Sequence, residues 1–231
     1  LWTISYGEFI RDLMVNRPRS SEVRVIVDTM DFHAKKYARK FADSGQAEDS
    51  DKAEQFGALE KVIYPLADIV VTVTENEVED IQNAIPDCAP LAVVPNIHEI
   101  SSDLAPLNER RDICFLGNFQ VNHNIDAARY FITKIWPIIK RQRPTLKFYL
   151  VGFSSEKLTE LTEYPGVHLV GHVKDLKSHL NRYRIFVCPM TYGAGMKGKI
   201  GIAMSNGLPV VSTSVGAEGF PVEDGRDCFV S

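Results

Sequence analysis

The sequence predicts an α/β protein built on parallel β-sheets, and three observations support this fold class. Short runs rich in β-branched residues alternate with amphipathic stretches, which is typical of βαβ units. Most of these runs end in Gly, Pro or Ser just before a helical pattern begins. The 231-residue chain is 45% hydrophobic, which is enough for one large core or two modest ones.

The first half of the chain holds three short apolar runs that predict strands. They lie at residues 23–27, 69–73 and 91–94. Between the first two, Asp51 has a side chain suited to a helix N-cap. It precedes apolar residues at helical spacing, Phe56, Leu59 and Ile63 among them, so we expect a helix there.

The second half alternates more regularly. Strands are expected at residues 113–116, 146–151, 167–170, 185–188 and 209–212. Helices are expected at residues 124–141, 154–162, 175–182 and 198–206. Ligands of open parallel sheets bind beyond the carboxyl ends of the strands. We therefore expect the functional residues in the loops that follow the strands.

A Ser-, Asp- and Pro-rich stretch separates the two halves and has the composition of a linker. It predicts a first domain at residues 1–100, a linker at 101–110 and a second domain at 111–231.

Composition excludes several function classes. The net charge of −4 and pI near 5.9 argue against a nucleic-acid binder that works through bulk positive charge. No apolar run approaches the ~20 residues of a membrane span. Four cysteines without CxxC spacing predict free thiols in a reducing, cytoplasmic compartment. The six histidines show no metal-ligand spacing, so we expect no metal site.

A glycine-rich loop with two lysines carries the densest chemistry. It follows a predicted strand, opens a predicted helix and consists of Gly193, Ala194, Gly195, Met196, Lys197, Gly198 and Lys199. Glycines let the backbone approach a ligand, and a helix N-terminus attracts anions. The loop therefore predicts a phosphate site, with a glycine-rich turn bearing solvated lysines as the alternative.

Two common phosphate motifs fit this loop incompletely. Its glycines spell GxGxxG, the dinucleotide fingerprint, which keeps an NAD(P)-binding oxidoreductase as an alternative. However, no acidic residue ends the following strand at 209–212. The loop also spells GxxxxGK, but Ile200 stands where a P-loop has a Ser or Thr hydroxyl for Mg²⁺, which disfavours a P-loop ATPase.

A series of motifs in order along the chain resembles one enzyme family. The motifs are residues 193–219 (GAGMKGKIGIAMSNGLPVVSTSVGAEG), Phe115-Leu116-Gly117-Asn118 with Asn124-Ile125-Asp126-Ala127, Val170-Gly171-His172-Val173, Asp31-Phe32-His33 and Val94-Pro95-Asn96. Together they resemble the retaining GT-B glycosyltransferases of group 1, family 4. The resemblance covers nearly the whole chain and implies two Rossmann-like domains with parallel sheets. It also implies that both are incomplete, with the start of the first and the end of the second missing.

This resemblance implies a reaction and a site. Such enzymes transfer a sugar from a nucleotide-diphosphate sugar to an acceptor without a metal or another cofactor, and the acceptor expected here is a glycan or a lipid-linked glycan. Lys199, Lys197 and the backbone of 193–198 would stabilise the departing diphosphate. Gly117 and Asn118 would approach that diphosphate, and His172 would lie beside the nucleobase. His33 is the candidate catalytic residue on the acceptor side, where a histidine bonded within its own loop is the alternative.

The sequence also departs from the family. Ile202 stands where members usually carry a glutamate that grips the ribose hydroxyls, and Ala194 stands at an earlier glutamate. Glu218 is a candidate substitute. These departures keep a second hypothesis open, a degenerate GT-B domain that binds nucleotide or glycan without turnover.

A basic cluster lies on a separate segment. Lys35, Lys36, Arg39 and Lys40 would touch a phosphorylated acceptor or anionic lipid on the inner face of a membrane, or form a solvated helix face. The acidic residues that follow favour the solvated face.

Overall fold

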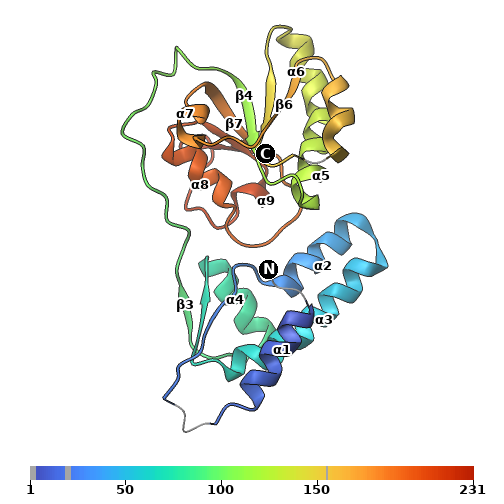
Figure 1. Ribbon diagram of the computed structural model, residues 1–231, viewed down its shortest axis with the longest axis vertical. Coiled ribbons are helices and arrows are strands. Elements are labelled where there is room, and N and C mark those ends of the chain that lie inside the picture. Colours follow the sequence, from blue (N-terminus) through green and yellow to red (C-terminus); the bar gives the residue numbers. More distant parts are fainter. Residues whose placement is uncertain (1–3, 19–21, 155) are drawn as a thin grey trace. The chain divides into compact units, whose positions relative to one another are not determined.

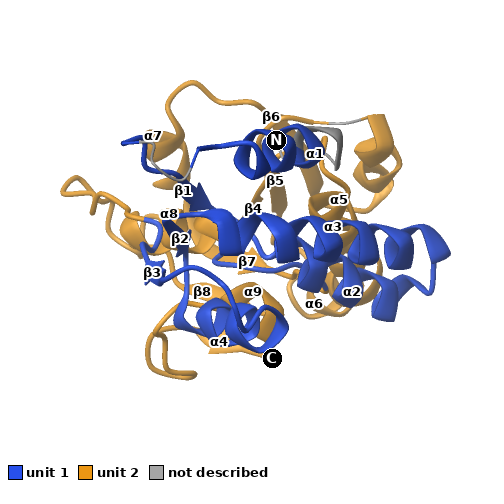
Figure 2. Ribbon diagram, turned by 90° about the horizontal axis from the view of Figure 1, so that it is seen from below, with its two compact units in different colours: residues 1–96, 192–196 blue, residues 97–191, 197–231 orange. Residues whose placement is uncertain are grey.

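The computed structural model describes residues 4–18, 22–154 and 156–231, and the chain forms two compact units (Figures 1 and 2). Unit 1 comprises Leu1–Asn96 with Tyr192–Met196, and unit 2 comprises Ile97–Thr191 with Lys197–Ser231. Residues 1–3 and 19–21 of the predicted first domain and residue 155 of the predicted helix 154–162 lie outside the described residues. Within the described part, no helix is long and apolar enough to cross a membrane.

Unit 1 contains a three-stranded parallel sheet in the order β1-β2-β3. Its elements are α1 (Ile4–Val15), β1 (Ile26–Asp28), α2 (His33–Ser44), α3 (Ala47–Leu66), β2 (Ile69–Thr72), α4 (Glu75–Ala84) and β3 (Leu91–Val93). The core of this unit gathers Ile63, Val70 and Ile81, all fully buried, from α3, the central strand and α4.

The predicted cap at Asp51 is wrong. Helix α3 begins at Ala47 after Gln46, which places Asp51 inside the helix. The preceding acidic residue, Asp49, lies in the first turn, where a negative charge is stabilised by the helix dipole. Asp49 is buried, and its carboxylate accepts a 2.6 Å hydrogen bond from Lys40 Nζ of α2. The helix therefore starts earlier than the sequence predicts, because a tertiary contact stabilises its first turn.

Unit 2 contains a six-stranded parallel sheet in the order β6-β5-β4-β7-β8-β9. Its elements are β4 (Arg111–Leu116), α5 (Asn122–Tyr130), η1 (Phe131–Ile135), α6 (Trp136–Gln142), β5 (Phe148–Val151), η2 (Glu156–Glu163), β6 (Val167–Gly171), α7 (Leu176–Leu180), β7 (Tyr183–Cys188), α8 (Gly198–Ser205), β8 (Val210–Ser212), α9 (Ser214–Ala217) and β9 (Phe229–Val230). Helices α5 and α6 lie on one side of the sheet, and α7 and α8 on the other (Figure 1). The resulting parallel, helix-covered sheet is the predicted fold class.

The predicted strands are all present, with ends shifted by at most three residues. The predicted helix 124–141 is instead divided, because a π-helical stretch, η1, separates α5 from α6. Pro137 lies at the start of α6 and has no N–H to donate to the preceding turn. The predicted helix 154–162 is a 3₁₀ helix, η2. The four cysteines are free thiols, and Cys114 and Cys188 are fully buried in central strands.

Candidate functional site

The carboxyl ends of three neighbouring strands in unit 2 are joined tightly. Gly117 N–H, after β4, donates to Val151 O of β5 at 3.0 Å, and Gly152 N–H donates to Gly171 O of β6 at 2.9 Å. Gly152 has φ +129°, and a Cβ there would lie 2.0 Å from Gly117 O. Only glycine therefore fits at this position, and the turn after β4 is held against the turn after β5.

A pocket of about 390 Å³ opens at these strand ends. It is lined by Leu116, Gly117, Asn118, Val151, Gly152, Phe153, His172, Val173, Leu176, Lys199 and Ile202. Four residues predicted from the sequence, Gly117, Asn118, His172 and Lys199, thus share one pocket, and Ile202 lines it as well. Apart from Lys199 and His172, the walls are largely apolar.

Lys199 projects from the first turn of α8, which begins at Gly198. Its Nζ donates to the side-chain carbonyl Oδ1 of Asn124 and lies 4.8 Å from the centre of the Phe115 ring. Burial lowers the pKa of Lys199 to about 8. Among the described residues, no carboxylate forms an ion pair with Lys199 that would offset this burial. An anion that enters the pocket would supply the missing negative charge.

Asn124 is a residue of this site that the sequence did not single out as functional. It is buried at 4% exposure on α5, and its Nδ2 donates to the carbonyl oxygen of Asn118 at 2.8 Å. Its Oδ1 accepts from Lys199, so one amide joins the turn after β4 to the lysine of α8. The sequence showed only that Asn124 is a polar residue at the start of a predicted helix. Its contacts with Asn118 and Lys199 depend on tertiary structure, which the sequence does not show.

Phe153 is a second residue that the sequence reading missed. Its ring stacks on the His172 ring with centroids 4.4 Å apart and planes 14° from parallel. Phe153 is 51% exposed although it is a large aromatic side chain. An exposed aromatic pair at the mouth of a pocket offers a flat face to another ring.

Lys197 and Glu218 face each other within unit 2. Their charged atoms are 3.9 Å apart, and their side chains are only 9% and 16% exposed. Thr213, whose Oγ1 accepts from Gly216 N at 3.0 Å and donates to Met190 O at 2.5 Å, fixes the turn that carries Glu218. Glu218 thus lies opposite a loop lysine and does not line the pocket.

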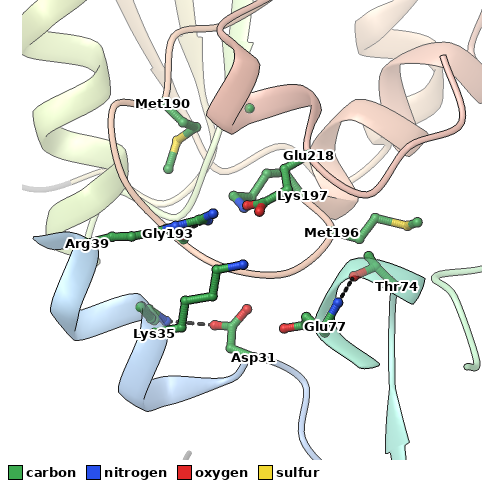
Figure 3. A network of polar contacts seen from close by, with 12 residues as sticks. Asp31, Lys35, Arg39, Thr74, Glu77, Met190, Gly193, Met196, Lys197 and Glu218 are labelled. Atoms are coloured by element: carbon green, nitrogen blue, oxygen red, sulfur yellow. Dashed lines mark hydrogen bonds and ion pairs between the residues drawn. The ribbon is translucent and has the colours of Figure 1, made fainter. Parts of the chain in front are cut away.

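The central part of the glycine-rich loop belongs to unit 1. Arg39 of α2 donates to the Gly193 carbonyl at 3.1 Å (Figure 3). Asn96 donates to the Met196 carbonyl at 3.3 Å. Gly195 has φ +65°, and a Cβ there would lie 2.8 Å from Asp31 Oδ1. The glycine therefore allows the loop to approach the residues before α2. The intervening Ala194 is buried at 5% exposure.

His33 begins α2 in unit 1 and is enclosed by other side chains. Its ring lies 4.9 Å from the Phe56 ring, and its Nδ1 is 3.9 Å from Glu60 Oε1. Burial, and then the charge of Lys36, lowers the pKa of His33, which favours the neutral imidazole at pH 7.

Two buried carboxylates hold the backbone around His33. Glu60 accepts from the backbone N–H groups of His33 and Ala34 at 2.9 and 3.2 Å. Glu77 accepts from Phe32 N at 3.1 Å and from Thr72 Oγ1 at 2.7 Å. Burial raises the pKa of both carboxyls, that of Glu60 to about 7. The histidine is thus positioned by residues that are distant in the sequence.

The basic cluster on α2 is engaged within unit 1. Lys35 forms an ion pair with Asp80, and Lys36 Nζ lies 2.7 Å from Asp31 Oδ2. Lys40 binds Asp49, and Arg39 binds the glycine-rich loop. Each of the three lysines therefore has an acidic partner within the unit, and Arg39 has a backbone carbonyl. In the part of the chain that the structure describes, no group of three or more His, Cys, Asp or Glu side chains is arranged to hold a metal ion.

The two parallel, helix-covered sheets match the GT-B type of α/β fold of the glycosyltransferases to which the chain is structurally similar. The family described as "Glycosyl transferases group 1" matches residues 110–231, more than half of the chain. The chain therefore belongs to the glycosyl transferases group 1 family.

Individual proteins resemble this chain in sequence or in fold. An uncharacterized 44.6 kDa protein in the cps region of Klebsiella pneumoniae is 27% identical over 147 residues, which are 60% of this chain and 38% of that protein. TarM of S. aureus aligns with 93% of this chain at TM-score 0.67 and 16% identity, which covers 41% of TarM. Anabaena HepE, solved with UDP and glucose, aligns with 99% of this chain at TM-score 0.60 and 13% identity. The alignment covers 62% of HepE, so the chain spans less than two thirds of each of these relatives.

Proposed function

We propose that this chain carries the donor site of a glycosyltransferase that moves a sugar from a nucleotide-diphosphate sugar to a glycan or lipid-linked acceptor. We further propose that it retains the anomeric configuration and uses lysine side chains, without a metal, to neutralise the diphosphate. The family assignment supports the reaction class, and the HepE structure with UDP and glucose supports this kind of donor.

The observation that carries the proposal is the position of Lys199. Its ammonium group lies in a pocket at the carboxyl ends of the strands, beside the turn of Gly117 and Asn118. It has an amide oxygen and an aromatic face for neighbours. A diphosphate bound there would gain a charge-assisted hydrogen bond in partly dehydrated surroundings, where such bonds are stronger than in water. In this proposal the same contact strengthens as negative charge develops on the leaving diphosphate.

We also propose roles for the other residues predicted from the sequence, and for Phe153. The Phe153–His172 pair provides a flat face for the nucleobase at the mouth of the pocket. Lys197, whose ammonium group lies 3.9 Å from the Glu218 carboxylate, is proposed as a second lysine that contacts the diphosphate. His33, kept neutral by burial, can donate a hydrogen bond to a sugar hydroxyl or accept one from it. The loop backbone of 193–198 is proposed to contribute N–H donors.

Titration with UDP, GDP, uridine and guanosine tests this proposal. Lys199→Ala should weaken binding of the diphosphate that binds best by about tenfold to a hundredfold, because a charge-assisted hydrogen bond is lost. Binding of the corresponding nucleoside should change little. Lys147→Ala, which removes an exposed lysine at the amino end of β5, is the matched control. Equal losses for diphosphate and nucleoside, or no binding at millimolar nucleotide, would overturn the proposal.

Ile202 favours a second candidate function, nucleotide or glycan binding without turnover. Its aliphatic side chain lines the pocket where hydroxyl-bearing ligands need hydrogen-bond acceptors. Ile202→Glu should tighten nucleoside-diphosphate binding if the ribose lies against α8. Turnover is then decided by measuring nucleotide release from UDP- and GDP-sugars, with and without simple sugars as acceptors. Tight binding with no release in either case would favour the binding function.

A further inference from the structure

A second, smaller pocket of about 220 Å³ adjoins the donor pocket within unit 2. It is lined by Glu99, Ile100, Ser101, Leu176, Lys177, Ile202 and Asn206. Leu176 and Ile202 line both pockets, so only these two side chains are shared between them. The two shared side chains are apolar, whereas Glu99, Ser101, Lys177 and Asn206 give the small pocket a polar lining.

The segment that carries Glu99 is fixed to α8 at two points. The His98 ring packs directly on Gly201, where a Cβ would lie 2.1 Å from two ring atoms. Three residues further on, Ser101 N–H donates to Ser205 O at 2.8 Å. Glu99 lies between these two contacts, so its segment passes beside the turn of α8 that contains Ile202.

Two buried oxygens in this small pocket have no hydrogen-bond partner in the structure. They are Ser101 Oγ and Asn206 Oδ1, on residues that are only 6% and 9% exposed. Asn206 Nδ2 donates to Ile202 O at 2.8 Å, which leaves its Oδ1 as an acceptor. Buried polar atoms without partners are costly. With the two carboxylate oxygens of Glu99, the residues that line this pocket carry four side-chain oxygens that can accept a hydrogen bond, which favours a ligand that donates hydrogen bonds.

We infer that Glu99 accepts hydrogen bonds from the ribose 2′- and 3′-hydroxyls of the bound nucleotide, and that Ser101 and Asn206 complete this subsite. The inference rests on the proposed function. A vicinal diol is a neutral pair of donors, which matches an acceptor-rich pocket with a single cation, Lys177. Ile202 itself cannot hydrogen-bond a hydroxyl, so a carboxylate from the neighbouring segment supplies what α8 lacks.

Nucleotide analogues distinguish this inference from the proposed function. Isothermal titration uses whichever of UDP and GDP binds more tightly, together with its 2′,3′-dideoxy analogue. Glu99→Ala should weaken binding of the parent nucleotide by about tenfold and leave the dideoxy analogue unaffected, because only the parent presents the diol. Glu109→Gln, an exposed carboxylate further along the same segment, is the matched control. Adding Ile202→Glu to Glu99→Ala should restore most of the lost affinity.

The outcomes separate cleanly. If wild-type protein binds the parent and dideoxy nucleotides equally, or if Glu99→Ala weakens both by the same factor, the subsite does not hold the ribose, while the proposed function stands. If neither UDP nor GDP binds, the proposed function itself fails. A thermal unfolding midpoint of Glu99→Ala equal to wild type confirms that a loss of affinity is local.

Discussion

Lys199 should make the affinity for a nucleoside diphosphate depend on pH above about 8. The pKa of its ammonium group is lowered from 10.5 to about 8 because the group is buried without a carboxylate partner. A bound diphosphate would supply that negative charge and return the pKa toward its ordinary value. Between these two pKa values, the bound state holds a proton that the free protein has lost.

The size of the effect follows from this difference. With a pKa of about 8, roughly one-tenth of the free protein carries the Lys199 proton at pH 9, so affinity falls about tenfold between pH 7 and pH 9. This corresponds to about 1.4 kcal/mol. The direction is fixed, since affinity is full near pH 7 and below and decreases as the pH rises through about 8. Proton uptake on binding should be about one half at pH 8 and approach one near pH 9.

Calorimetric titration at pH 7.5, 8.5 and 9.0, in two buffers of different ionisation enthalpy, measures both affinity and proton uptake. Terminal phosphates are already ionised in this range, because their second pKa is about 6. Lys199→Arg is the control, because arginine stays protonated and its pH profile should be flat. A flat profile in the wild type, or the same slope in Lys199→Arg, would refute the role assigned to Lys199.

Three further predictions concern the scaffold of the sites. Gly152→Ala should lower the free energy of unfolding by more than about 2 kcal/mol, whereas Gly225→Ala, at φ +77° in open space, should lower it by only about 1 kcal/mol. Urea unfolding compares the two variants, and equal losses would contradict the close approach of Gly152 to Gly117 O. Asn124→Asp should place a carboxylate beside Lys199, raise its pKa, and weaken diphosphate binding at least tenfold; a pH profile with the break still near 8 would contradict this contact. Glu60, whose pKa is raised from 4.5 to about 7, keeps a proton in the folded state that the unfolded state has lost, so the free energy of unfolding should fall by about 3 kcal/mol from pH 4.5 to 7. Glu60→Gln should flatten this fall in denaturation curves measured at pH 5, 6 and 7. An unchanged slope in that variant would show that Glu60 is not responsible.

The parallel sheets could be predicted from the sequence because the pattern of each strand is local. A buried parallel strand is a short β-branched run, and such a run is visible in the sequence without any knowledge of its neighbours. The placement of Gly117, Asn118 and Lys199 follows from the same reasoning. Each comes directly after a strand or opens the helix that follows one, and the carboxyl ends of parallel strands meet at one edge of the sheet.

The contacts that complete these sites could not be predicted, because they join residues far apart in the chain. Asn124 bridges Asn118 to Lys199, a residue 75 positions away from it. Glu60 caps the backbone of His33 from a helix 27 positions further along. The tight approach of Gly152 to the turn after β4 depends on strand register, which no local pattern encodes.

Helix boundaries failed for a related reason. Asp51 has the right side chain for a cap, but the contact between Lys40 and Asp49 stabilises an earlier start. Pro137 is evident in the sequence, but the π-helical stretch that precedes it could not be predicted. That stretch forms where Pro137 lacks the N–H that would donate to the preceding turn.

A crystal structure of this chain soaked with UDP or GDP tests the central claim most directly. We predict that the diphosphate lies in the pocket at the carboxyl ends of β4, β5 and β6, with a phosphate oxygen within hydrogen-bond distance of Lys199 Nζ and of the turn at Gly117 and Asn118. A nucleotide bound with its phosphates away from Lys199, or an empty pocket at saturating nucleotide, would contradict the account.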